Sequence, residues 1–186
     1  MGAEFDVHDL VRAAAAGDSH GWDGLVERFG ALVWSTARAY GLSSDEGADA
    51  AQTTWLRLAE QLGRLQDGHD RIGVWLASTA RQESLRLLGA RVADHADPGQ
   101  EAPASVAATA TSPEREVMLW RVVGDLPEHC RRLLRVLSAV PPPDQDELAA
   151  ALALEVAEVP AARAACLEEF RHRMANIGIK ADAADS

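Results

Sequence analysis

The stretch Leu10–Leu42, LVRAAAAGDSHGWDGLVERFGALVWSTARAYGL, decides the fold of this chain. Its apolar and small residues recur at steps of three and four, which is the spacing of one face of an α-helix. The periodic residues are Leu25, Val26, Phe29, Leu32, Val33, Thr36, Ala37 and Tyr40. The first half of the chain is therefore predicted to begin with an amphipathic helix that packs against neighbours.

Two further segments, DAAQTTWLRLAEQL (Asp49–Leu62) and IGVWLASTARQESLRLL (Ile72–Leu88), carry the same pattern. Their periodic residues are Ala48, Ala51, Gln52, Trp55, Leu56, Leu58 and Leu62, then Ile72, Trp75, Leu76, Thr79, Ala80, Leu85 and Leu88. The repeated period predicts a bundle of consecutive helices.

Breaks between the periodic segments set the expected helix boundaries. Ser43 or Ser44 is the expected N-cap of the helix after Gly41, and Pro141-Pro142-Pro143 is a hard break in the second half. The expected helices are Val7–Ala16, Trp22–Tyr40, Ser44–Leu65, Arg71–Ala93, Pro113–Leu126, Pro127–Val140, Asp144–Leu154 and Val159–Met174. Residues 94–112 are rich in Pro, Ala, Ser and Thr without helical period, which predicts a flexible linker.

The net charge and composition of the chain argue against several classes of function. The net charge is −11, with −4 in residues 1–93 and −7 in residues 94–186, whereas a DNA-binding domain usually carries a basic footprint. No run approaches the ~20 apolar residues of a membrane span, and no basic stretch precedes an apolar run at the N-terminus, so a cytoplasmic protein is expected. Phosphate loops, nucleophile motifs and metal-ligand spacings are missing from the sequence, so we expect neither an enzyme nor a cofactor.

The two cysteines, Cys130 and Cys166, lie far apart on predicted helices without CxxC spacing. This arrangement is more typical of buried thiols than of a disulfide or a metal site. His129 beside Cys130 has no second ligand pair at a suitable spacing, so no metal is expected.

The three quoted segments resemble conserved region 2 of extracytoplasmic-function sigma factors, the small promoter-recognition subunits of bacterial RNA polymerase. The resemblance implies an all-α fold: a region 2 bundle and a region 4-like helix-turn-helix domain, two small helical domains joined by a flexible linker. The expected parts are residues 1–93 (region 2-like domain), 94–112 (linker), 113–176 (helix-turn-helix domain) and 177–186 (acidic tail). The partners it implies are core RNA polymerase and promoter DNA, with an anti-sigma or other regulatory protein as a further candidate.

The resemblance assigns core-polymerase binding to one helix face. Asp49 and Gln52 lie at i and i+3 and share that face, next to Trp55 and Arg57. A matching Asp-x-x-Gln pair faces the polymerase clamp in sigma factors. A solvated polar stripe is the alternative reading of the same pair.

The turn after this helix and the following helix resemble the part that melts and reads the −10 element. A protein that captures a single strand needs base-stacking faces and cations near the phosphates. The candidate residues are Arg71, Trp75, Arg81, Gln82, Arg86 and Arg91, with Asp67 to Asp70 as the loop around a flipped base. A Trp among apolar neighbours such as Trp75 is more often a core residue.

The second half departs further from the family. DLPEHCRRLLRVLSAV (Asp125–Val140) resembles the opening of region 4, and a helix-turn-helix pattern follows it. Pro160, Ala161 and Ala162 occupy positions where relatives carry polar and basic readers, and relatives usually have Gly in the turn. Major-groove reading needs donors and cations there. Only Arg163, Arg171 and Arg173 are left to touch a DNA backbone in the −35 region.

Two hypotheses follow. In the first, the chain is a sigma factor-like initiation protein that binds core polymerase and recognises or melts the −10 element, with weakened or absent −35 reading. In the second, it is a sigma-like interaction regulator whose C-terminal domain binds a protein partner instead of DNA, since an acidic helical face suits a basic partner.

Overall fold

The computed structural model describes residues 6–65, 71–93, 119 and 121–176. Every regular element within these ranges is a helix. The helices are α1 Val7–Ala15, α2 Ser19–Ala39, α3 Ser44–Leu65, α4 Ile72–Ala93, α6 Glu128–Leu137, α7 Gln145–Leu152, the short 3₁₀ helix η2 Val156–Glu158, and α8 Val159–Asn176. The predicted all-α fold class, with one helical set on each side of the predicted linker, is confirmed.

Most helix ends lie within three residues of their predicted positions. The helix expected from Trp22 begins earlier, at Ser19, because the Asp18 carboxylate caps it and accepts the N–H of His20 at 2.9 Å. Ser43 caps α3: its hydroxyl oxygen accepts the N–H of Glu46 at 3.2 Å, and the Glu46 carboxylate accepts the N–H of Ser43 at 2.8 Å.

Parts of the expected organisation lie outside the described residues. They include the Asp67–Asp70 loop, residues 94–112, the acidic tail 177–186 and most of the helix expected from Pro113, of which residues 121–124 are helical. Among the described helices, none is long and apolar enough to cross a bilayer.

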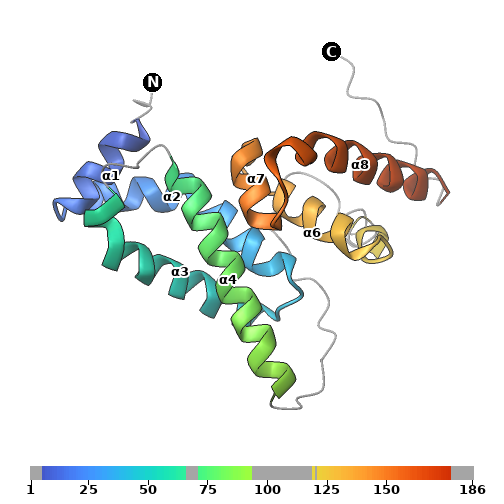
Figure 1. The fold of residues 1–186 in the computed structure, drawn as a ribbon, viewed down its shortest axis with the longest axis horizontal. Helices are drawn as coiled ribbons and strands as arrows, with labels where there is room; N and C mark the ends of the chain where they lie inside the picture. The colour runs from blue at the N-terminus through green and yellow to red at the C-terminus, as the bar shows by residue number, and fades with distance from the viewer. Residues whose placement is uncertain (1–5, 66–70, 94–118, 120, 177–186) are drawn as a thin grey trace.

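The two helical sets pack against one another. Figure 1 shows α1 and α3 on one side of α4, and α6, α7 and α8 on the other. Helix α7 packs on α4, and α6 packs on α2. This contact brings the C-terminal helices onto the region 2-like bundle. It was not predicted from the sequence.

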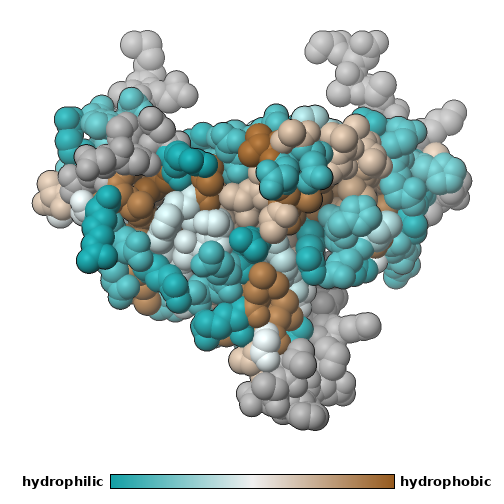
Figure 2. Space-filling model, in the orientation of Figure 1, coloured by the Kyte–Doolittle hydropathy of each residue, from teal (hydrophilic) through white to brown (hydrophobic). Residues whose placement is uncertain are grey.

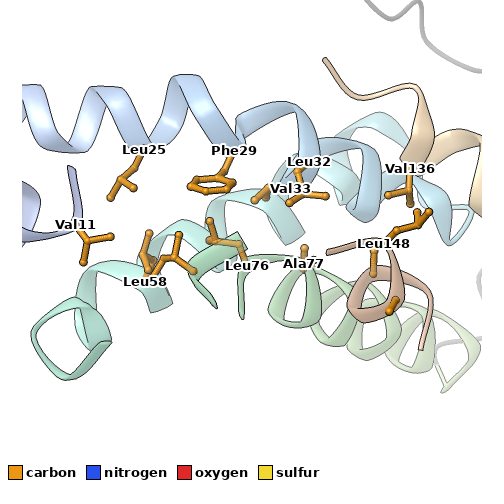
Figure 3. Packing of buried hydrophobic residues seen from close by; sticks show 14 of the residues in the cluster. Val11, Leu25, Phe29, Leu32, Val33, Leu58, Leu76, Ala77, Val136 and Leu148 are labelled. Atoms are coloured by element: carbon orange, nitrogen blue, oxygen red, sulfur yellow. The ribbon is translucent and has the colours of Figure 1, made fainter. Parts of the chain in front are cut away.

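A single hydrophobic core runs through both sets. In Figure 3, Val136 of α6 and Leu148 of α7 lie next to residues of the N-terminal helices. Its buried members include Val11, Leu25, Phe29, Leu32, Val33, Leu58, Leu62, Ile72, Leu76, Ala77, Ala80, Val136, Leu148, Ala149, Ala151 and Val159. The burial of these apolar side chains favours the packed arrangement of the two sets.

Gly73 allows α7 to approach α4 closely. A Cβ atom at this position would lie 2.0 Å from Oε1 of Glu147 and 2.9 Å from Cε1 of Phe29. Glu147 is itself buried and closes a capping box with Asp144 at the start of α7. A glycine in α4 thus places the N-terminal end of α7 against the first bundle.

Candidate functional site

The proposed polymerase-binding pair lies on the surface of α3. Asp49 and Gln52 are both exposed and are one turn apart. Leu56, one further turn along, is 59% exposed. The three side chains form one exposed stripe, which we call the α3 stripe, with an apolar residue beside two polar ones.

Leu56 corrects the sequence interpretation, which counted it among the core residues of its helix. The buried residues of α3 are Gly47, Ala50, Thr54, Leu58 and Leu62, and Leu56 is out of phase with all of them. The same correction applies to Ala48, Val26 and Leu85, which are exposed. Figure 2 shows separate hydrophobic patches on a largely hydrophilic face.

Both candidate tryptophans contribute to packing. Trp55 and Trp75 are half-buried against the main core. The Trp55 ring meets Trp22 edge to face, with ring centroids 6.0 Å apart. This geometry is favourable for aromatic pairs, so Trp55 fastens α3 to α2.

A buried carboxylate joins two of the proposed site residues. Glu83 is 2% exposed and accepts from Arg57 at 2.7 Å and from Arg86 at 2.8 Å. Arg57 had been assigned to polymerase binding and Arg86 to DNA, and the structure brings them together around one acid. The sequence interpretation missed Glu83, although its i, i+3 spacing to Arg86 was a usable signal.

The side chain of Arg81, on α4, lies at the C-terminal end of α7. Its Nε donates to the backbone oxygen of Ala150 at 3.1 Å, and the hydroxyl of Tyr40 donates to that of Ala151 at 2.7 Å. The last carbonyl groups of a helix have no partner within the helix, and a cation is favourable beside them. Two donors from the first bundle therefore complete the C-terminal end of α7.

Burial changes the pKa values of two groups at this contact. Desolvation raises the pKa of Tyr40, against the opposing charges of Arg81 and Arg132, whose guanidinium carbon lies 4.6 Å from the Tyr40 ring centroid. Desolvation also raises the pKa of Glu147, partly offset by its hydrogen bond to the Asp144 backbone. Polar groups in this interface are thus buried and hydrogen-bonded.

The remaining −10 candidates differ in exposure. Arg71 and Gln82 are exposed. Arg91 is half-buried and pairs with Glu46 at 3.3 Å. The structure thus brings Arg81, Arg86 and Arg91 into contacts within the chain and leaves Gln82 on the outer face of α4.

The helix-turn-helix shape is present in the C-terminal set. Helix α7 ends at Ala153, which adopts the left-handed conformation with a φ of 57°, and η2 leads into α8. Pro160 and Ala161 are exposed at the start of α8. The turn position where relatives usually carry Gly is thus formed by a residue with a Cβ, at some cost in strain.

The three −35 candidates lie in two different settings. Arg163 and Arg171 line a surface groove of about 530 Å³ between the start of α7 and α8, together with Asp144 and Glu168. Arg173 donates to the Glu169 carboxylate at 2.8 Å and to the Asp125 backbone oxygen at 2.6 Å, which fastens α8. The groove therefore carries charges of both signs.

The cysteines are not free thiols, as the sequence had suggested, but form a disulfide. Cys130 of α6 and Cys166 of α8 are bonded, with Cα atoms 5.1 Å apart. Their separation of 36 residues gave no local signal, and only the packing of α8 on α6 brings them together. One ring nitrogen of His129 lies within 4.8 Å of both sulfurs, but in this state the sulfurs are bonded to each other.

The geometry describes an all-helical protein with a helix-turn-helix in its C-terminal part. Residues 25–92 match the family model of Sigma-70 region 2. Residues 25–92 are therefore similar to the sigma-70 region 2 domain, as the sequence segments in this range predicted.

A solved structure supports the arrangement of the whole fold. It is described as CnrH in complex with the cytosolic domain of CnrY, and its similarity extends over 92% of this chain and 99% of that chain. The TM-score is 0.62 and the sequence identity 21%, so this likeness concerns the fold. A search of curated proteins gives no match to this chain.

Proposed function

We propose that this chain is a sigma factor-like initiation protein that binds core RNA polymerase through the α3 stripe and reads the −10 element through α4. It acts by binding and not by catalysis. The observation that carries the proposal is the region 2 domain, in which Asp49 and Gln52 lie exposed on one face. Leu56 adds an apolar contact of the kind that protein interfaces bury.

The −10 proposal rests on the outer face of α4. Gln82 is exposed there, and Arg81 precedes it. In the arrangement described, Arg81 binds the Ala150 carbonyl. The guanidinium has N–H donors besides Nε, so Arg81 can contact a DNA strand while it holds the end of α7.

The polymerase contact is tested with the double variant Asp49→Ala/Gln52→Ala in the full chain. Loss of a few charge-assisted contacts costs on the order of 2 to 4 kcal/mol, so the Kd for core polymerase should rise at least ~30-fold while helicity by circular dichroism is unchanged. Asp23→Ala/Glu27→Ala, both exposed on α2 and off the α3 stripe, is the matched control. Wild-type affinity of the first variant would refute the assignment.

The second proposal concerns the C-terminal helices: they bind a protein surface and contribute little to −35 reading. The groove beside Arg163 and Arg171 carries both signs of charge, which suits a polar protein segment. A complex of the CnrH fold with a protein domain supports a regulatory protein, of the anti-sigma kind, as its occupant.

The −35 contact is tested in polymerase loaded with the full chain. Arg163→Ala/Arg171→Ala should leave the affinity for promoter DNA within about twofold of wild type, because on this proposal the two arginines make no phosphate contacts in the wild type. A matched pair, Arg71→Ala/Gln82→Ala, should weaken promoter binding. A tenfold loss in the first variant would establish −35 contact by these arginines.

A further inference from the structure

The disulfide lies in the centre of the C-terminal helices. Cys130 and Cys166 are 3% and 0% exposed and pack with Leu126 and Leu133 in a second hydrophobic cluster. They are the only two cysteines of the chain. No other thiol within the chain can compete for either partner.

The position of Cys130 favours its thiolate. It is the third residue of α6, and Pro127 at the N-cap supplies no side-chain hydrogen bond to the first turn. The N–H groups of a first turn carry partial positive charge, which stabilises an anion at this end of a helix. Cysteines at helix N-termini have lowered pKa values for this reason, whereas burial among apolar residues, as for Cys130, opposes the charged form.

His129 supplies the second requirement, a proton acceptor that reaches solvent. It is exposed, while one of its ring nitrogens lies within 4.8 Å of both buried sulfurs. Proton transfer over this distance would pass through one bridging water. A nucleophile beside a base and a resolving cysteine is the arrangement of a reactive thiol pair.

We propose that Cys130 and Cys166 form a reversible thiol–disulfide site, oxidised by peroxide and reduced by small monothiols, with His129 as the proton acceptor of Cys130. This site goes beyond the proposed function and does not depend on it. It concerns the covalent state of the C-terminal helices and what that state does to their packing.

The oxidation proceeds in two balanced steps. The Cys130 thiolate attacks one oxygen of hydrogen peroxide, the O–O bond breaks, and a sulfenic acid and hydroxide form; the proton held by His129 converts the hydroxide to water. The Cys166 sulfur then attacks the Cys130 sulfur, and the S–O bond breaks. The hydroxide leaves with the Cys166 proton as a second water. Two thiols are oxidised to one disulfide, and one peroxide is reduced to two waters.

Reduction reverses the covalent change by exchange. One monothiolate attacks a sulfur of the disulfide and forms a mixed disulfide, and a second monothiolate releases the protein thiol. The products are two protein thiols and one oxidised monothiol. The electrons come from the two small thiols.

The covalent state controls how firmly α8 is held. Helix α6 packs on the first bundle through Val136, whereas α8 is joined to α6 through the cluster around Cys166. The disulfide therefore anchors α8 to a helix that is itself held by the bundle. Its reduction should increase hydrogen exchange in α8 more than in α2 or α3, because exchange follows local opening.

The test follows disulfide formation in the full chain by alkylation and intact mass. When alkylated in denaturant, the reduced wild type should gain two alkyl groups. After treatment with hydrogen peroxide it should gain none. Excess reduced glutathione should then make both thiols alkylatable again. His129→Ala should slow oxidation on the order of tenfold at neutral pH, since a neighbouring base and cation raise thiolate reactivity. His172→Ala, exposed on α8, is the matched control and should oxidise at the wild-type rate.

Three results would overturn the proposal. Peroxide could leave both thiols of the folded chain alkylatable, or glutathione could fail to reduce the disulfide without denaturant. If His129→Ala and the wild type have the same melting temperature and the same oxidation rate, His129 is not the proton acceptor. Faster α8 exchange in reduced wild type supports the structural consequence, and unchanged exchange would reject it.

Discussion

At the scale of single residues, side chains of the first bundle complete a helix of the second. Arg81 and Tyr40 donate to the last carbonyl groups of α7, which a helix cannot satisfy internally. An arginine in this position serves packing in the described arrangement, while the resemblance assigns it to DNA. Only Nε is used in the packing contact, and the guanidinium has further N–H donors, so the two roles do not exclude each other.

Tyr40→Phe tests the packing role. The change removes one buried hydrogen bond and leaves the Ala151 oxygen with one donor fewer. The free energy of unfolding should fall by about 0.5 to 1.5 kcal/mol. Urea denaturation followed by circular dichroism measures it, and an unchanged midpoint would show that the hydroxyl contributes nothing to the contact.

Arg81→Ala tests the DNA role. If Arg81 contacts a phosphate in the polymerase complex, the salt slope for a single-stranded −10 oligonucleotide should become shallower by about 0.7. Arg64→Ala, exposed in the last turn of α3, is the control and should leave the slope unchanged. An unaltered slope for Arg81→Ala would confine this residue to the contact with α7.

At the scale of elements, the end of α7 is the least regular point of the helix-turn-helix. Ala153 has a φ of 57°, a conformation that glycine adopts without steric cost. Leu154 follows and donates its N–H to the Ala149 oxygen at 3.0 Å, which closes the helix end. The turn therefore forms without glycine because its hydrogen bond and the packing around it outweigh the strain.

Ala153→Gly should relieve that strain. Left-handed backbone costs an L-residue roughly 1 to 2 kcal/mol, and the greater freedom of glycine in the unfolded chain offsets about 0.4 to 1 kcal/mol of it. We expect a net stabilisation of about 0.5 kcal/mol in thermal unfolding. Ala165→Gly, exposed within α8, should instead destabilise by about 1 kcal/mol. Equal losses in both variants would mean that the turn carries no strain.

At the scale of the whole molecule, one core spans both helical sets and encloses a carboxyl group. Glu147 is buried between α7 and α4, close to Gly73, with Asp144 and Arg28 as its charged neighbours. Desolvation raises its pKa above the ordinary 4.5. The folded state therefore keeps the Glu147 proton to higher pH than the unfolded chain does.

This difference predicts the pH dependence of the packed arrangement. Between the unfolded pKa and the raised folded pKa the native state binds more protons, so the contribution of Glu147 is most favourable below 4.5 and is lost as pH rises through the folded value. Glu147→Gln should abolish this part of the pH dependence, and Glu60→Gln, exposed on α3, should leave it in place. Thermal unfolding across that window measures it; identical profiles for Glu147→Gln and wild type would contradict the assignment.

The sequence by itself determined the helices. Periodicity, capping residues and breaks placed most of their ends within three residues, since these signals act within one or two turns of the chain. It also led to the region 2 domain, which the family match over residues 25–92 confirms. Asp49 and Gln52 are exposed, as expected for the face that the resemblance assigned to them, although Gln52 had also been grouped with the periodic residues of its helix.

The tertiary structure alone decided which distant residues meet. The bond from Arg81 to Ala150 joins residues 69 apart, that from Tyr40 to Ala151 residues 111 apart, and the disulfide residues 36 apart. No local pattern encodes such pairs, because they result from the packing of α6 on α2, of α7 on α4 and of α8 on α6. Leu56 shows a different error: it was grouped with the periodic apolar residues, but it is out of phase with the buried residues of α3 and lies on the solvent face.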